Sequence, residues 1–145
     1  VSPDVGGIKM ARAYAKRLSA GLAICDKRRN GPTDTEVVHI IGDVEGRNVL
    51  LVDDMIATGT SIVNAASACK KNGAQEVYIC ATHPVLAGSA MEKLENSPVK
   101  EIIVTDTIPL GDKSLPNLKV LSVAELVGEA IRRIHKSESV SSLFL

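Results

Sequence analysis

The sequence predicts an α/β domain, built on a mostly parallel β-sheet with helices on both faces. Short β-branched apolar runs alternate with amphipathic stretches along the 145 residues. Several of these runs are apolar without polar alternation, which is typical of strands buried on both faces of a sheet. Because helical crossovers join parallel strands, this order predicts a parallel sheet covered by helices. The length suits one domain and leaves little room for two.

Each element has a recognisable signal. The apolar runs predict strands at 22–25, 37–41, 48–52, 76–81, 101–105 and 119–123. Apolar residues at helical spacing predict helices at 8–18, 61–72, 90–96 and 123–135. The second of these helices is followed by Gly73, a suitable C-terminal cap. Charged residues combined with Asn30-Gly31 and Pro32 predict an exposed, mobile loop over 28–34, and 42–46 predicts a turn.

Composition excludes several classes of function. Seventeen Lys and Arg balance seventeen Asp and Glu, and aromatic residues make up only 2% of the chain. Nucleic-acid-binding domains usually carry a basic excess or stacking aromatics, so we expect no nucleic-acid partner. No apolar run approaches the roughly 20 residues of a membrane helix, and no signal peptide pattern is present, so we expect no membrane association.

The cysteines and the first residues carry two further expectations. Cys25, Cys69 and Cys80 are widely spaced, odd in number and set among apolar neighbours. This pattern predicts reduced core residues in a cytoplasmic protein. The chain begins with Val-Ser-Pro-Asp and no initiator Met, so we expect a piece of a longer protein.

The strongest motif follows the apolar run at 48–52, where Asp53 and Asp54 precede a loop of small residues that continues from Thr58 to Ser61. In parallel α/β sheets, ligands bind at the carboxyl ends of the strands. Backbone N–H groups at a helix N-terminus bind anions, and the hydroxyls of Thr58, Thr60 and Ser61 add donors beside Gly59. Two carboxylates would repel a phosphate but suit sugar hydroxyls, a metal or both, so the pattern indicates a sugar phosphate. The alternative is a turn with one N-cap residue, which needs far fewer of these residues.

Two other clusters stand at the expected edge of the sheet. Asp4 precedes Gly6 and Gly7, which allow a ligand to approach the backbone at a helix start; an N-cap for the helix at 8–18 is the alternative. Lys27 and Arg29 open the mobile loop, where they either clamp a charged transition state or are merely solvated. His83 follows a strand, and a lone histidine there is more often structural than catalytic.

The loop at 53–61 resembles the phosphoribosyl diphosphate-binding motif of type I phosphoribosyltransferases. Six segments in order resemble the C-terminal half of the ribose-phosphate diphosphokinase (phosphoribosyl diphosphate synthetase) family. They are 1–7, 25–29, 53–61, 81–88, 104–109 and 139–144. The resemblance covers essentially the whole chain as one domain, 1–145, and implies that the N-terminal half of the family's chain is absent.

The resemblance implies a type I phosphoribosyltransferase-like fold and a defined reaction. The diphosphoryl group of ATP would pass to the 1-hydroxyl of ribose 5-phosphate, giving phosphoribosyl diphosphate and AMP, with Mg²⁺ as cofactor. The family forms homo-oligomers, with a hexamer of dimers expected for the parent enzyme. The isolated chain is expected to be inactive.

The resemblance also assigns roles to residues. The ribose 5-phosphate site would be Asp53, Asp54, Thr58, Gly59, Thr60 and Ser61. The diphosphate loop would be Asp4, Val5, Gly6 and Gly7, with Asp4 also a magnesium ligand. The catalytic residues would be Lys27 and Arg29, and an allosteric phosphate or ADP site would include Ser139 and Ser141.

Two alternative functions remain, and the sequence departs from the family's usual residues at two positions. The alternatives are a type I phosphoribosyltransferase that consumes phosphoribosyl diphosphate, and a non-catalytic regulatory subunit associated with the synthetase. The basic cluster at 27–29 favours the synthetase over both. The family usually has Gly where Thr60 stands and often Asp where Ala57 stands, which affects the detailed geometry of the 5-phosphate loop.

Overall fold

A four-stranded parallel sheet forms the centre of the structure, a computed structural model that describes residues 1–28 and 37–144. Its strands are β3 (Asn48–Met55), β4 (Glu76–His83), β5 (Glu101–Thr105) and β6 (Leu118–Leu121). They lie in the order β3-β4-β5-β6, and every neighbouring pair is parallel. The predicted parallel sheet is therefore confirmed.

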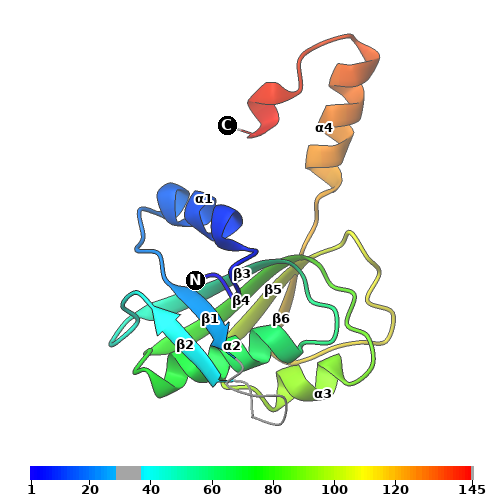
Figure 1. Cartoon of the computed structure of the whole chain (residues 1–145). Helices are drawn as coiled ribbons and strands as arrows, with labels where there is room; N and C mark the ends of the chain where they lie inside the picture. The colour runs from blue at the N-terminus through cyan, green and yellow to red at the C-terminus, as the bar shows by residue number, and fades with distance from the viewer. Residues whose placement is uncertain (29–36, 145) are drawn as a thin grey trace.

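Helices cover both faces of this sheet, as predicted. The helices are α1 (Ile8–Leu18), α2 (Thr60–Lys71), α3 (Ala90–Glu95) and α4 (Ala124–His135), followed by the 3₁₀ turn η1 (Ser141–Phe144). Figure 1 shows α1 on one face, with α2 and α3 on the other. Leu51, Ile79 and Ile102, one from each of three neighbouring strands, are fully buried in the core between these layers.

The first two strands depart from the parallel arrangement. Strands β1 (Ile24–Arg28) and β2 (Val37–Ile41) pair antiparallel with each other and form a separate two-stranded sheet. No helix was predicted between them, and strands joined without a crossover helix pair as a hairpin. Strand β1 starts later than the predicted 22–25 and runs to Arg28, so Arg28, predicted as the first residue of the mobile loop, lies in the strand with Lys27.

The first residues of the chain join the two sheets. Ser2 forms a parallel bridge with Ile24 of β1. On its other side, the Val1 ammonium donates to the Leu50 carbonyl at 2.6 Å, and the Val52 N–H donates to the Val1 carbonyl at 3.1 Å. Residues 1–2 thus lie between β1 and β3 in strand-like pairing. This placement brings Asp4 to the carboxyl edge of β3.

The C-terminal helix stands apart from the sheet. Helix α4 has no buried residue and extends away from the core (Figure 1). Asp106 holds its start, accepting hydrogen bonds from the Ser122 hydroxyl at 2.5 Å and the Val123 N–H at 2.9 Å. No helix within the described part of the chain is long and apolar enough to cross a membrane.

Candidate functional site

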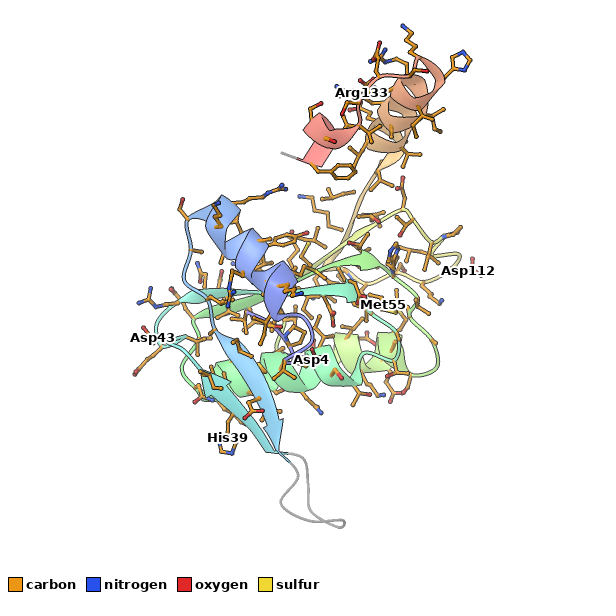
Figure 2. The ribbon with its side chains drawn as sticks, turned by 45° about the horizontal axis from the view of Figure 1, so that its top comes forward. Asp4, His39, Asp43, Met55, Asp112 and Arg133 are labelled. Carbon is orange, nitrogen blue, oxygen red and sulfur yellow. The ribbon has the colours of Figure 1, made fainter. Side chains whose placement is uncertain are left out.

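A small cavity of about 130 Å³ lies at the carboxyl end of β3. Asp4 and Asp53 line it together with the loop that leads into α2. The further lining residues are Met55, Ile56, Ala57, Thr58, Gly59, Thr60, Ser61 and Ile62. Figure 2 shows Asp4 where the chain enters α1 and Met55 at the end of β3. Residues separated by some 50 positions in the sequence therefore share one site.

The loop before α2 leaves the helix N-terminus open. Gly59 is the N-cap residue, with φ of 74°, and no side chain caps the helix. The first turn contains no acidic residue, so its N–H groups and the positive end of the helix dipole face the cavity without a carboxylate partner. The alternative of a simple side-chain N-cap is therefore wrong for this helix.

The loop is held in place by the segment that precedes α3. The Leu86 N–H donates to the Ile56 carbonyl and the Ala87 N–H donates to the Ala57 carbonyl, each at 2.9 Å. A Cβ on Gly59 would lie 3.5 Å from the backbone of Ala90. These contacts fix the loop against the start of α3 and the segment that precedes it.

Asp4 organises a second loop at the cavity. Its Oδ1 accepts hydrogen bonds from the N–H groups of Gly6 at 2.8 Å and Gly7 at 3.1 Å. The N-cap of α1 is Gly7, without a side-chain hydrogen bond, so Asp4 is not the N-cap. A Cβ on Gly7 would lie only 2.8 Å from Ser2 Oγ, so the backbone passes too close to Ser2 for a larger residue.

Asp53 is partly buried and lies next to other acids, and both features make its charged form less favourable. Burial is the largest cause that raises its pKa from 3.8 to about 6, and the carboxylates of Asp54 and Asp4 raise it further. The Asp54 N–H donates to Asp53 Oδ1 at 2.9 Å and acts in the opposite direction. Asp54 itself is exposed and does not line the cavity. Of the two predicted acids, the structure therefore brings one to the cavity.

Sequence reasoning missed Lys93 on α3. Its Nζ donates to Thr60 Oγ1 at 2.8 Å and to the Thr58 carbonyl at 3.3 Å. Of the cationic side chains in the described residues, Lys93 is the one that donates hydrogen bonds to this loop. The sequence carries no signal for it, because only the packing of the loop against α3 brings the two together.

The basic cluster is only partly described. The backbone of Lys27 pairs with Val38 across the β1–β2 hairpin. Arg29 and the rest of the predicted mobile loop through Asp34 lie outside the described residues. The roles predicted for Lys27 and Arg29 stay predictions.

The other predicted residues lie elsewhere. Val5 is exposed at the start of the Asp4 loop. Ser139 and Ser141 follow α4, where the Ser141 N–H donates to Ser139 Oγ at 3.2 Å and Arg133 donates to the Ser139 carbonyl at 3.1 Å. Figure 2 shows Arg133 in the projecting C-terminal region, distant from Asp4. His83 Nδ1 lies 2.9 Å from Thr107 Oγ1, which agrees with a structural role.

The cysteines are placed much as predicted. Cys25 and Cys69 are fully buried, Cys80 is half-buried, and the three form no disulfide bond with one another.

The carboxylates at the cavity suit a hard cation. The described residues contain no group of three or more His, Cys, Asp or Glu that could enclose a metal ion. Magnesium, however, is usually bound through one or two carboxylates together with substrate phosphates and water. Asp4 and Asp53 both line the cavity, so the donor set fits Mg²⁺ held jointly with a phosphorylated ligand.

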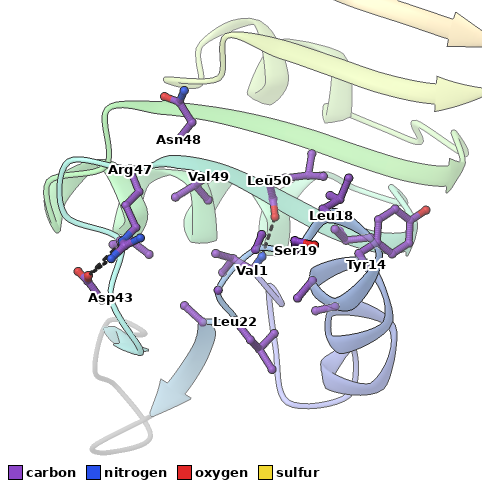
Figure 3. A pocket seen from close by; sticks show the side chains of 17 residues that line it. Val1, Tyr14, Leu18, Ser19, Leu22, Asp43, Arg47, Asn48, Val49 and Leu50 are labelled. Carbon is purple, nitrogen blue, oxygen red and sulfur yellow. Dashed lines mark hydrogen bonds and ion pairs between the residues drawn. The ribbon is translucent and has the colours of Figure 1, made fainter.

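A larger cavity of about 700 Å³ lies on the α1 side of the sheet. Figure 3 shows it between Tyr14 and Leu18 of α1 and the start of β3, with Val1 at its wall. An ion pair between Arg47 and Asp43, 2.9 Å long, stands at one end. The two cavities share no lining residue, so the larger cavity is not part of the candidate sugar-phosphate site.

The fold is that of a domain within a known enzyme. The crystal structure of phosphoribosylpyrophosphate synthetase from Mycobacterium smegmatis superimposes with a TM-score of 0.86 at 38% sequence identity. The match covers 94% of this chain and 44% of that one. At this identity the likeness extends beyond fold alone.

The sequence comparisons then place the chain in a family. The phosphoribosyl synthetase-associated domain family matches residues 29–145, and the chain belongs to it. The ribose-phosphate pyrophosphokinase of Clostridium acetobutylicum is 56% identical over 145 residues, covering 99% of this chain and 46% of that protein. That of Gloeobacter violaceus is 53% identical over 146 residues, covering 99% and 44%. The chain therefore spans about half the length of these curated relatives.

Proposed function

We propose that this chain is the C-terminal, ribose 5-phosphate-binding half of a ribose-phosphate pyrophosphokinase. One observation carries the proposal: a single cavity joins two carboxylates, three hydroxyls and an uncapped helix N-terminus. Phosphate suits the helix end, and vicinal hydroxyls suit the acids. The high identity to proteins named ribose-phosphate pyrophosphokinase supports the same substrate.

In the proposed reaction, the groups at the carboxyl end of β3 bind ribose 5-phosphate. The N–H groups and hydroxyls from Thr58 to Ser61 bind the 5-phosphate, while Asp53 and Asp54 accept hydrogen bonds from the ribose hydroxyls. The ribose 1-oxygen attacks the β-phosphorus of ATP, the bond from that phosphorus to the α-phosphate oxygen breaks, and AMP leaves. Such transfer depends mainly on positioning and electrostatic stabilisation.

The remaining groups serve the transferred diphosphoryl group. The Asp4 loop would place it near the ribose, and Lys27 with Arg29 would stabilise its developing charge. Asp4 and Asp53 would hold Mg²⁺, which when bound would neutralise phosphate charge. The half of the protein outside this chain would complete the ATP site, and the whole enzyme would be a cytoplasmic homo-oligomer.

The test is an AMP assay on the full-length protein with MgATP and ribose 5-phosphate. We expect AMP formation that requires both substrates and disappears in the Asp53→Asn, Asp54→Asn double variant. Formation of nucleotide from phosphoribosyl diphosphate and a nucleobase, without AMP from ATP, would instead indicate a phosphoribosyltransferase. Ribose 5-phosphate binding without any turnover would indicate the non-catalytic subunit.

A further inference from the structure

Lys93 stands where the loop before α2 meets α3. It is half-buried, and its ammonium contacts the loop at two points, Thr60 Oγ1 and the Thr58 carbonyl. The N–H groups of residues 86 and 87, just before α3, donate hydrogen bonds to the carbonyls of residues 56 and 57 in the same loop. The loop is therefore fixed by backbone hydrogen bonds to the segment that leads into α3, the helix that carries Lys93.

The contact determines which way the Thr60 hydroxyl acts. An ammonium can only donate, so Thr60 Oγ1 accepts from Lys93 and must direct its single hydrogen elsewhere. The hydroxyl of Thr58 lies 3.4 Å from it, too far for a strong O–H···O bond. Thr60 is thus prepared to donate to a ligand oxygen in the cavity that it lines.

The charge of Lys93 also offsets the repulsion between the carboxylates of this cavity and a bound phosphate. Asp4 and Asp53 line it, and both repel a phosphate dianion. The helix N-terminus supplies only a partial positive charge. An ammonium 2.8 Å behind the Thr60 oxygen adds a full charge on the side of the cavity formed by the loop.

We propose that Lys93 is a positioning residue for the 5-phosphate, acting through Thr60 to make that hydroxyl an obligatory donor to the anion. The inference rests on the proposed function of the cavity and deepens it. It predicts discrimination between phosphorylated and unphosphorylated ribose. It is specific to a chain with a hydroxyl at position 60, where Lys93 has an acceptor to bind.

The test compares Lys93→Met, Lys93→Arg and Thr60→Val in the full-length protein. We expect Lys93→Met to raise KM for ribose 5-phosphate about tenfold, as for loss of one charge-assisted hydrogen bond. The kcat and the KM for ATP should stay within about twofold, and Lys93→Arg should restore most of the affinity. Lys100→Met is the matched control, because that lysine pairs with Glu76 at the opposite end of the sheet.

A double-variant cycle shows whether Lys93 acts through Thr60. If it does, the double variant Lys93→Met, Thr60→Val should have a KM for ribose 5-phosphate little higher than that of either single variant. Additive losses would overturn the proposed route, and an unchanged KM in Lys93→Met would overturn the proposal as a whole. Equal losses in kcat and in ATP affinity would indicate a general structural defect and also overturn it.

Direct binding separates this inference from the proposed function. Calorimetric titration with ribose 5-phosphate, inorganic phosphate and ribose should show weaker binding of the two phosphate-bearing ligands to Lys93→Met. If the wild-type protein forms no AMP, the proposed function fails, yet these titrations still decide the role of Lys93. Equal phosphate affinity in wild type and Lys93→Met would overturn the inference while leaving the function intact.

Discussion

Replacing Asp53 by Asn should stabilise the fold at neutral pH, because the native site holds this carboxylate at a cost. Its pKa is raised from 3.8 to about 6, chiefly by burial. A rise of this size corresponds to about 3 kcal/mol, at about 1.4 kcal/mol for each tenfold change in acidity. The side chain still contacts solvent, so we expect about 1 kcal/mol. The amide oxygen of Asn can still accept the hydrogen bond from the Asp54 N–H.

The sign and the pH window follow from the two pKa values. Below pH 4 the carboxyl is protonated in both the folded and the unfolded chain, so it contributes nothing. Between pH 4 and 6 the unfolded chain releases the proton first, and the stability of the wild type falls relative to Asp53→Asn. Above pH 6 the full difference is present.

Urea unfolding of the 145-residue chain at pH 4, 5, 6 and 7.5, without divalent cations or phosphate, measures this difference. Asp112→Asn, the same change at an exposed aspartate outside the cavity, is the control. A gain that is independent of pH, or a loss at pH 7.5, would refute the electrostatic reasoning. A gain in stability together with lost ribose 5-phosphate binding would identify Asp53 as an acid retained for its ligand rather than for the fold.

Four further outcomes are expected. Asp53→Asn combined with Asp54→Asn should abolish ribose 5-phosphate binding in calorimetry, and unchanged affinity would contradict the site assignment. Lys27→Ala or Arg29→Ala in the full-length protein should lower kcat roughly a hundredfold or more with smaller changes in KM, because the pair would act in the transition state; a change confined to KM would argue against this. Gly59→Ala should destabilise the chain by about 1–2 kcal/mol in urea, since its φ of 74° disfavours any side chain. The isolated chain should bind ribose 5-phosphate yet form no AMP, and sustained AMP formation by it alone would show a complete active site.

Much of the fold could be predicted because its signals are local. The apolar runs at 48–52 and 76–81 predict the strands observed at 48–55 and 76–83, and α1 was predicted with its observed bounds. The antiparallel pairing of β1 with β2 could not be read in the same way. A strand's apolar residues show that it is buried, but its partner depends on the connection and on distant segments. The pairing of residues 1–2 with both β1 and β3 is likewise set by tertiary structure.

The same distinction between local signals and tertiary contacts applies to the site: local signals predict its central loop, and tertiary contacts add the rest. The residues from Asp53 to Ser61 are contiguous, so their spacing alone predicts a loop with acids, hydroxyls and a helix start. Asp4 joins them because strand pairing of residues 1–2 carries it to the same edge. Lys93 depends on how a loop packs on another helix, a contact 33 residues apart that no short motif encodes.

The geometry of the cavity explains why acids and phosphate donors can coexist in so small a volume. The carboxylates of Asp4 and Asp53 come from the strand ends, whereas the uncapped N–H groups and the Lys93–Thr60 pair come from the start of α2 and from α3. Negative and positive potential are therefore supplied by different elements of the fold. A ligand with hydroxyls at one end and a dianion at the other matches both sets of groups at once, whereas free phosphate or free ribose matches only one. This complementarity predicts that ribose 5-phosphate binds more tightly than either part, and that the Lys93→Met change reduces its advantage over ribose about tenfold while leaving the hydroxyl contacts unaltered.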